Sequence, residues 1–161
     1  IENSIYCNDR SISDNTLYGY GTIQGYYSAY YRLFHDAKPQ YKCLQQNDSF
    51  TLKKDAGGIE GYGNNALKYP VALLTADELT FAGFESGSRD SNNFLNDVSL
   101  YWSLTPARFD STDAVNFYVY NGYTSHAGTF IVGGVFPAIS LKKNVLISNG
   151  TGVYNDPYVV E

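Results

Sequence analysis

The chain is poor in charge, and in positive charge above all. Charged residues make up 17% of its 161 positions, and 11 Lys and Arg against 16 Asp and Glu give a net charge of −5. Surfaces that bind nucleic acid neutralise phosphates with clustered Lys and Arg, so we expect no nucleic-acid partner. The longest apolar runs, at 69–74 and 135–141, are far shorter than the roughly 20 residues that span a bilayer, so we expect no direct membrane insertion of this domain.

Soft metal ligands are equally scarce. Two cysteines and two histidines are too few for the usual structural zinc sites. Cys7 and Cys43 form either a disulfide, as in exported proteins, or a pair of reduced core thiols. One loop is rich in the oxygen ligands that calcium prefers, but Asn-rich loops are commonly solvated turns, and we expect no metal and no cofactor. The candidate oxygen ligands in this loop are Asp90, Asn92, Asn93, Asn96 and Asp97.

The sequence also lacks the common patterns of a catalytic site. It contains no G-x-S-x-G nucleophile elbow, and Ser125 and His126 are adjacent, so they cannot form a nucleophile–base pair with each other. The carboxylates of Asp77 and Glu78 are explained by the start of a helix. We therefore expect a binding protein and no enzyme.

Tyrosine is what the chain has in abundance, with 16 residues, together with 15 glycines and many Asn and Ser. This composition is typical of adaptable binding surfaces, because Tyr gives a large amphipathic contact area at low entropy cost. It is also compatible with a strand-rich extracellular domain that has no special site. With 161 residues, of which 43% are hydrophobic, the chain has the size of a single domain over 1–161.

Hydrophobic periodicity predicts two helices in the first half of the chain. Aromatic residues at 26, 27, 30, 31 and 34 form one stripe of a helix over 25–34. Thr75 and Glu78 have the spacing of a capping box, which starts a second helix that ends near Gly83. Short strands follow, so the predicted class is α+β, with two helices and a loop-rich, mostly antiparallel β half. The expected strands are 100–104, 114–120, 129–132, 138–141 and 144–147.

A succession of motifs covers almost the whole chain: residues 5–10, 41–43, 69–79 (YPVALLTADEL), 101–106 (YWSLTP), 134–152 and 155–160. Together they resemble the C-terminal domain of exported, often pilin-like bacterial proteins. Such domains are similar to the formylglycine-generating-enzyme type of C-type lectin fold, and many carry the variable region of a diversity-generating retroelement. The formylglycine-generating fold includes an oxidase, which needs a pair of reactive cysteines near its C-terminal half. Both cysteines of this chain lie in the first 43 residues, which argues against oxidase activity. One departure is Phe136, where the family pattern Gly-Val-Arg-Pro has Arg.

The resemblance implies a buried frame and an exposed ligand-binding surface. The frame comprises Tyr101, Trp102, Leu104, Pro106, Phe109, Phe117, Val119, Val135, Pro137, Ile139 and Leu141. The ligand-binding surface comprises Ser103, Thr105, Ala107, Arg108, Asp110, Ser111, Asp113, Tyr118, Tyr120, Tyr123, Ser125, His126, Thr129, Phe130 and Val132. Its expected anchors are the types that dominate binding hot spots, namely Arg108, Tyr118, Tyr120, Tyr123 and Phe130.

Residues 103–136 are the candidate variable region. Retroelement diversification replaces adenines, and from AAC codons it cannot produce Lys, Glu, Gln, Met or Trp. None of these residues occurs in this range. Their absence supports the hypothesis that residues 103–136, which carry the ligand-binding surface, are diversified.

The sequence therefore predicts an extracellular or cell-surface adhesin or receptor-binding domain, with a protein or glycan ligand on another cell or surface. The chain begins at Ile1 with no initiator Met and no leader, and we expect a monomeric domain of a larger anchored protein. Two alternatives remain open. One is a structural pilin or surface-assembly subunit, whose Tyr-rich face packs against a neighbouring subunit. The other is a calcium-dependent sugar-binding lectin.

Overall fold

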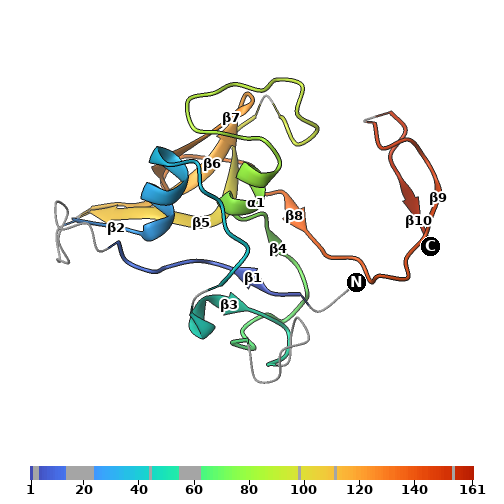
Figure 1. The fold of residues 1–161 in the computed structure, drawn as a ribbon, viewed down its shortest axis with the longest axis horizontal. Helices are drawn as coiled ribbons and strands as arrows, with labels where there is room; N and C mark the ends of the chain where they lie inside the picture. Colours follow the sequence, from blue (N-terminus) through green and yellow to red (C-terminus); the bar gives the residue numbers. More distant parts are fainter. Residues whose placement is uncertain are drawn as a thin grey trace.

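The computed structural model describes residues 1, 4–13, 24–43, 45–54, 63–97, 99–110, 112–153 and 155–161 (Figure 1). An antiparallel sheet with the strand order β2-β5-β6-β7 forms its centre, flanked by short helices and by two-stranded pairs. The fold is a loop-rich α+β arrangement, which confirms the predicted class. Within the described ranges, no helix has the length and apolar character needed to cross a membrane.

The central sheet consists of β2 (Gln24–Tyr26), β5 (Tyr101–Asp110), β6 (Ala114–Tyr120) and β7 (Tyr123–Gly128). The strand predicted at 114–120 is confirmed, because β6 has these boundaries. A tight turn leads from β6 to β7, and its two residues, Asn121 and Gly122, have φ values of 50° and 86°. An Asn-Gly pair adopts these values at low cost and is a strong hairpin signal. The strand expected at 129–132 is wrong, because the hairpin places β7 directly after this turn.

Three further two-stranded antiparallel pairs occur in the described part of the chain, outside the central sheet. They are β1 (Tyr6–Cys7) with β3 (Ser49–Phe50), β4 (Ala72–Leu73) with β8 (Pro137–Ala138), and β9 (Ile147–Asn149) with β10 (Val159–Val160). The β9–β10 hairpin is set apart from the body, beyond the extended segment that follows β8 (Figure 1). The predicted strands at 138–141 and 144–147 overlap β8 and β9 only at their ends.

The first helix begins later than the aromatic stripe predicts. The beginning of the stripe belongs to β2, and the helix is a π-helix, η2 (Tyr30–His35). Gly25 explains this difference, since a Cβ at this position would lie 2.6 Å from the ring of Phe109 in the neighbouring strand. A glycine lets the two backbones approach closely, so pairing with β5 overrides the helical period here. A short 3-10 helix, η3 (Gln46–Asp48), follows.

The second helix, α1 (Ala76–Phe81), begins and ends as predicted. Thr75 Oγ1 accepts a hydrogen bond from Glu78 N at 3.1 Å, and Glu78 Oε2 accepts one from Thr75 N at 2.8 Å, which completes the capping box. Gly83 follows the helix with φ +101°. Ala76 N, another amide of the first turn, donates to Thr105 Oγ1 in β5 at 2.9 Å. The helix is thereby fixed to the sheet at its N-terminus.

One face of the central sheet packs against η2 and α1 and forms the core. Two clusters of buried side chains lie there, one under η2 and the start of α1 and one under the rest of α1. The first contains Ala29, Leu33, Ala76, Ala107, Val115 and Phe117. The second contains Leu79, Phe84, Tyr101 and Val119.

Alternation along β5 starts from the buried Tyr101, and it places Ser103, Thr105 and Ala107 on the core face, where they are 1%, 0% and 0% exposed. The prediction that these three residues lie on the ligand-binding surface is therefore wrong. The layer of helices leaves room only for small side chains here. Thr105 holds α1, and Ser103 Oγ accepts a hydrogen bond from Thr105 N at 3.2 Å.

The predicted frame is correct for Tyr101, Phe117 and Val119, which are buried. Other members of the frame lie outside the two core clusters: some are half-buried on the opposite face of β5, and the others are exposed around β8. They are Trp102, Leu104, Pro106, Val135, Pro137, Ile139 and Leu141. Phe109 is half-buried against Gly25.

The N-terminal segment is tied to the body by covalent and ionic links. Of the two alternatives for Cys7 and Cys43, the disulfide is the one formed, with the Cα atoms 5.5 Å apart. Arg32 of η2 lies between two buried carboxylates, and its Nη2 donates to Asp9 Oδ2 at 2.5 Å and to Asp77 Oδ2 at 3.1 Å. This guanidinium joins the N-terminal segment, η2 and α1.

Candidate ligand-binding surface

The face of the central sheet opposite the core carries a row of aromatic side chains. In β6, Tyr118 and Tyr120 alternate with buried residues. Tyr118 stands opposite Trp102 of β5 on one side and Ser125 of β7 on the other, and Tyr120 stands opposite Tyr123. Residues directly opposite in antiparallel strands point to the same face. We name this set, Trp102, Tyr118, Tyr120, Tyr123 and Ser125, the tyrosine face.

The rings of the tyrosine face meet edge to face. The centroids of Trp102 and Tyr118 are 6.1 Å apart at an interplanar angle of 86°, and those of Tyr120 and Tyr123 are 6.2 Å apart at 83°. Tyr120 is 41% exposed, and the other members of the face are half-buried. Aromatic side chains held in paired strands lose little entropy on binding, so this face is suited to contact a ligand.

Trp102 is the member of this face that the sequence analysis missed, because the resemblance placed it in the frame. The alternation of β5 contains the missing signal. Once Tyr101 points into the core, Trp102 must point away from it.

The segment after β7 adds apolar side chains beside the sheet. The ring of Phe130 lies against Gly128, and Phe130 and Val132 are 75% and 95% exposed. Gly133 lies against the indole of Trp102, and Gly134 pairs with Tyr101 at the beginning of β5. The segment therefore leads from the edge strand β7 back to the tyrosine face, with Phe130 and Val132 accessible as the sequence predicts.

Three predicted surface residues lie at the far end of β6 from the Asn121–Gly122 turn. Thr129 is exposed, and its N–H donates to Ala114 O at 2.9 Å. Asp113 is half-buried, and Asp110 is the last residue of β5. Ser111, also predicted, lies outside the described residues.

Arg108 and His126 belong to a different environment, the aromatic cluster of η2. The His126 ring lies 5.1 Å from Tyr30 and 4.9 Å from Phe34 between centroids. The Arg108 guanidinium lies 5.8 Å from the ring of Tyr26. The prediction that these two residues share one surface with the tyrosines of β6 is wrong, because His126 stands opposite the buried Phe117 and so faces the helix.

Burial in this cluster lowers the pKa of His126, and the positive charge of Arg108 lowers it further. His126 is therefore neutral at pH 7. A half-buried neutral imidazole packed on two aromatic rings supports the fold and has no nucleophile beside it in the described contacts.

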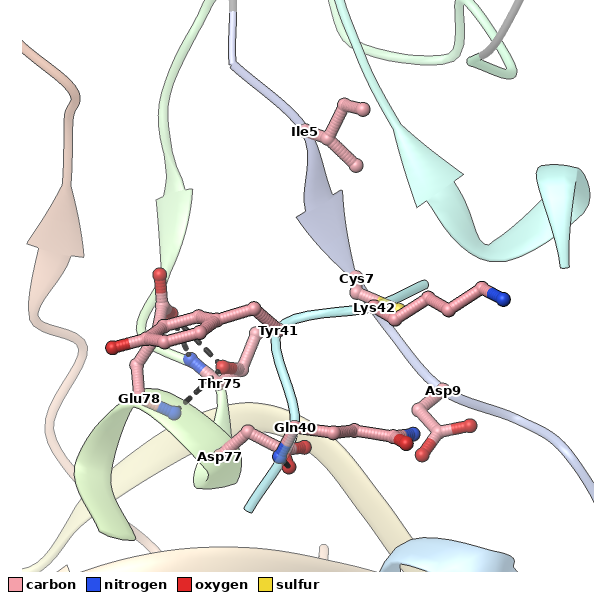
Figure 2. Close-up of a pocket in the computed structure, with 9 residues that line it drawn as sticks. All are labelled: Ile5, Cys7, Asp9, Gln40, Tyr41, Lys42, Thr75, Asp77 and Glu78. Atoms are coloured by element: carbon pink, nitrogen blue, oxygen red, sulfur yellow. Dashed lines mark hydrogen bonds between the residues drawn. The ribbon is translucent and has the colours of Figure 1, made fainter. Parts of the chain in front are cut away.

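A hollow of about 90 Å³ lies between the N-terminal segment and α1 (Figure 2). Its carboxylates are occupied by structural hydrogen bonds: Asp77 Oδ1 accepts from Gln40 N at 2.7 Å, and Glu78 Oε2 accepts from Thr75 N and Oγ1. Asp9 and Asp77 also bind Arg32. These carboxylates hold the domain together, and we assign them no chemistry.

The oxygen-rich loop 90–97 uses its side chains to form its own turns. Asp90 Oδ1 accepts from Asn92 N at 3.0 Å, Asn93 Oδ1 from Leu95 N at 3.0 Å and Asp97 Oδ1 from Ser99 N at 2.7 Å. Among the described residues there is no group of three or more His, Cys, Asp or Glu that could hold a metal ion. The calcium-dependent lectin gains no support from this loop.

An apolar groove of about 400 Å³ lies between the β4–β8 pair and the segments around β3. Apolar side chains line it almost throughout: Phe50, Leu67, Val71, Ala72, Leu73, Leu104, Val135 and Pro137.

Comparison of the chain with family models, curated proteins and solved structures gives no match. The tyrosine face and its apolar margin are the feature on which we base the proposed function. They combine partly exposed aromatic rings with a strand support, and they take no part in either core cluster.

Proposed function

We propose that this chain is an extracellular or cell-surface ligand-binding domain with a C-type-lectin-like fold, and that its tyrosine face contacts a protein or glycan ligand. The observation that carries the proposal is the separation of the two faces of β6. Val115, Phe117 and Val119 are buried in the core clusters, while Tyr118 and Tyr120 point to the other face and belong to neither cluster. The side chains that bind can therefore change without loss of the core.

Three features support the proposed fold and location. The helices cover one face of an antiparallel sheet, the chain is rich in loops, and a disulfide closes the N-terminal part. Disulfides persist in oxidising compartments, which fits an exported domain. These features agree with the resemblance of the motifs at 69–79 and 101–106.

We further propose that residues 103–136 are diversified by a retroelement, within limits that the burial pattern sets. Substitutions are tolerated where a side chain faces solvent, and Ser103, Thr105 and Ala107 are excluded because they are buried. Under this proposal, the positions free to vary are Asp113, Tyr118, Tyr120, Tyr123, Ser125, Thr129, Phe130 and Val132.

A binding experiment tests the proposed face. Wild-type domain is panned against a phage-displayed random peptide library and applied to a glycan microarray. The selected binder is then measured against a variant with Tyr118→Thr, Tyr120→Thr and Tyr123→Thr, in which Thr preserves the preference for extended backbone. The proposal predicts at least a hundredfold weaker binding by a variant that still unfolds cooperatively.

A matched control separates this face from the rest of the surface. A variant with Tyr41→Thr, Tyr69→Thr and Tyr158→Thr removes three exposed tyrosines that lie outside the tyrosine face. It should bind as the wild type does. Equal binding by the wild type and the β6–β7 variant would contradict the proposal.

An assembly subunit is the second candidate, and the β9–β10 hairpin favours it. This hairpin stands apart from the body (Figure 1), and Leu146, Ile147, Val159 and Val160 are exposed on it or beside it. Exposed apolar side chains on a projecting element are typical of contacts with another subunit. Sedimentation from 1 to 500 μM distinguishes the two functions, because an assembly subunit associates with rising concentration, whereas the proposed binding domain stays monomeric.

A further inference from the structure

A third cavity, of about 240 Å³, lies between the 94–97 loop and the beginning of β5. It is separate from the tyrosine face and from the hollow of Figure 2. Its lining residues are Leu74, Phe94, Leu95, Asn96, Asp97, Tyr101 and Phe136.

Three of these lining residues are aromatic. The ring of Phe136 lies on the ring of Tyr101, with centroids 4.5 Å apart at 36°, and Tyr101 is fixed by its OH, which donates to Leu95 O at 2.8 Å. Phe94 is 81% exposed and Phe136 is 44% exposed. Both phenyl rings are accessible to solvent and line the same cavity.

The polar lining residues provide acceptors. Among the described residues that line the cavity, Asp97 contributes the one carboxylate, and none is Lys or Arg. Asn96 Oδ1 is buried and accepts no hydrogen bond from the described residues, while its Nδ2 is occupied by a bond to Ser91 O at 3.0 Å. Because less than 1 Å² of Asn96 Oδ1 is accessible, Asp97 is the acceptor that the cavity offers to a ligand.

We propose that this cavity binds a primary alkylammonium group, either the side chain of a lysine in a protein ligand or a free small amine. The aromatic rings attract a cation through their faces, and the Asp97 carboxylate adds a charge of opposite sign. The N–H groups of a primary ammonium also donate hydrogen bonds to the Asp97 carboxylate, which a quaternary ammonium cannot do. The site does not depend on the tyrosine face and stands if that face binds nothing.

The position of Phe136 strengthens this inference. The phenyl ring of Phe136 forms a wall of the cavity. An Arg side chain would place a positive charge at the same wall and exclude an ammonium ligand. Phe136→Arg therefore tests the site with a single change on an exposed residue.

The experiment is an NMR titration of the ¹⁵N-labelled domain with n-butylammonium, Nα-acetyl-lysine methylamide, tetramethylammonium and n-butanol. We expect saturable shifts of the Asn96 side-chain NH2 and the Ser99 amide with the two primary amines. Binding of tetramethylammonium and of butanol should be at least tenfold weaker. Butanol bound as tightly as butylammonium, or no saturable shift with either amine, would overturn the proposal.

Variants separate the charge and the rings from general effects on the fold. Asp97→Asn retains the acceptor for Ser99 N and should weaken butylammonium at least tenfold, while Phe136→Arg should abolish binding. Asp90→Asn is the matched control, since Asp90 makes the same kind of turn in the same loop but does not line the cavity, and it should bind as the wild type does. Unchanged binding by Asp97→Asn would overturn the proposal.

Two further outcomes assign the source of the amine and its relation to the proposed function. If acetyl-lysine methylamide binds as tightly as butylammonium, the site accepts lysine of a protein; if only butylammonium binds, the occupant is a free amine. The triple tyrosine variant should retain butylammonium binding. Failure of the tyrosine face and failure of this cavity are thereby distinguishable.

Discussion

Phe117 and Tyr118 are consecutive residues of β6 with opposite surroundings. Phe117 is 1% exposed and packs in the core under η2, while Tyr118 points to the other face and meets the indole of Trp102 edge to face. The side chains that form the core therefore lie on one side of the sheet, and those of the candidate binding surface lie on the other.

Phe117→Ala and Tyr118→Thr should differ sharply in their effect on folding. Removal of a buried phenyl ring leaves a cavity, and we expect the free energy of unfolding to fall by about 3–5 kcal/mol. Tyr118→Thr keeps a side chain suited to a strand and should change it by about 1 kcal/mol or less. Urea denaturation followed by circular dichroism measures both values, and a similar loss in the two variants would place Tyr118 in the core.

The disulfide should contribute strongly to stability, because it closes a long segment of the chain, with a sequence separation of 36. In the chain-entropy model, such a cross-link stabilises the folded state by about 3–4 kcal/mol. We expect the variant with Cys7→Ala and Cys43→Ala to lose this amount in urea denaturation without reductant. With dithiothreitol present, the wild type should become as unstable as the variant, and a persistent difference would count against the disulfide.

Arg32→Met should be one of the most destabilising changes of a charged residue in this chain. It leaves the buried carboxylates of Asp9 and Asp77 without their shared cation, and breaking such a buried arrangement costs about 3–5 kcal/mol. Lys38→Met is the control, since Lys38 and Asp36 form an exposed pair 3.6 Å apart that contributes about 0–1 kcal/mol. Thermal unfolding of the two variants side by side checks the difference; equal melting temperatures would refute the bridging role of Arg32.

His126 should make stability depend on pH. Burial, and then Arg108, lowers its pKa below the usual 6.5 in the folded state. Between the lowered value and 6.5 the unfolded chain binds more protons, so the free energy of unfolding rises with pH in this window and falls as the pH drops below 6.5. His126→Phe should remove this part of the dependence, measured by urea denaturation between pH 5 and 7.5.

The matching control for His126 is Ser125→Ala, a change at the neighbouring residue of β7 that removes no ionisable group. It should retain the pH dependence of the wild type. If the free energy of unfolding depended on pH equally in the wild type and in His126→Phe, the lowered pKa of His126 would be contradicted.

Local signals made part of the fold predictable from the sequence. The capping box at Thr75 and Glu78 acts within one turn, and it fixed α1 correctly. The alternation of Val115, Phe117 and Val119 with polar and aromatic residues fixed β6. These patterns predict structure well because they depend only on residues that are close together in the sequence.

Long-range packing decided what the sequence could not predict. Ser103 and Thr105 are polar, yet they are buried because only small side chains fit beneath α1 and because Thr105 binds the amide of Ala76. Gly25 moved the start of the first helix by allowing β2 to pair against Phe109. His126 faces η2 because the Asn121–Gly122 turn sets the register of β7.

Diversification of the tyrosine face is tested by sequencing the encoding gene in many isolates, beside any near-copy of the segment for residues 103–136. We expect substitutions confined to adenines of the near-copy, at the codons of Tyr118, Tyr120, Tyr123 and Ser125. The codons of the buried Ser103, Thr105, Ala107 and Phe117 should stay constant. Substitutions spread equally over buried and exposed positions, or the absence of any near-copy, would contradict a diversified binding face.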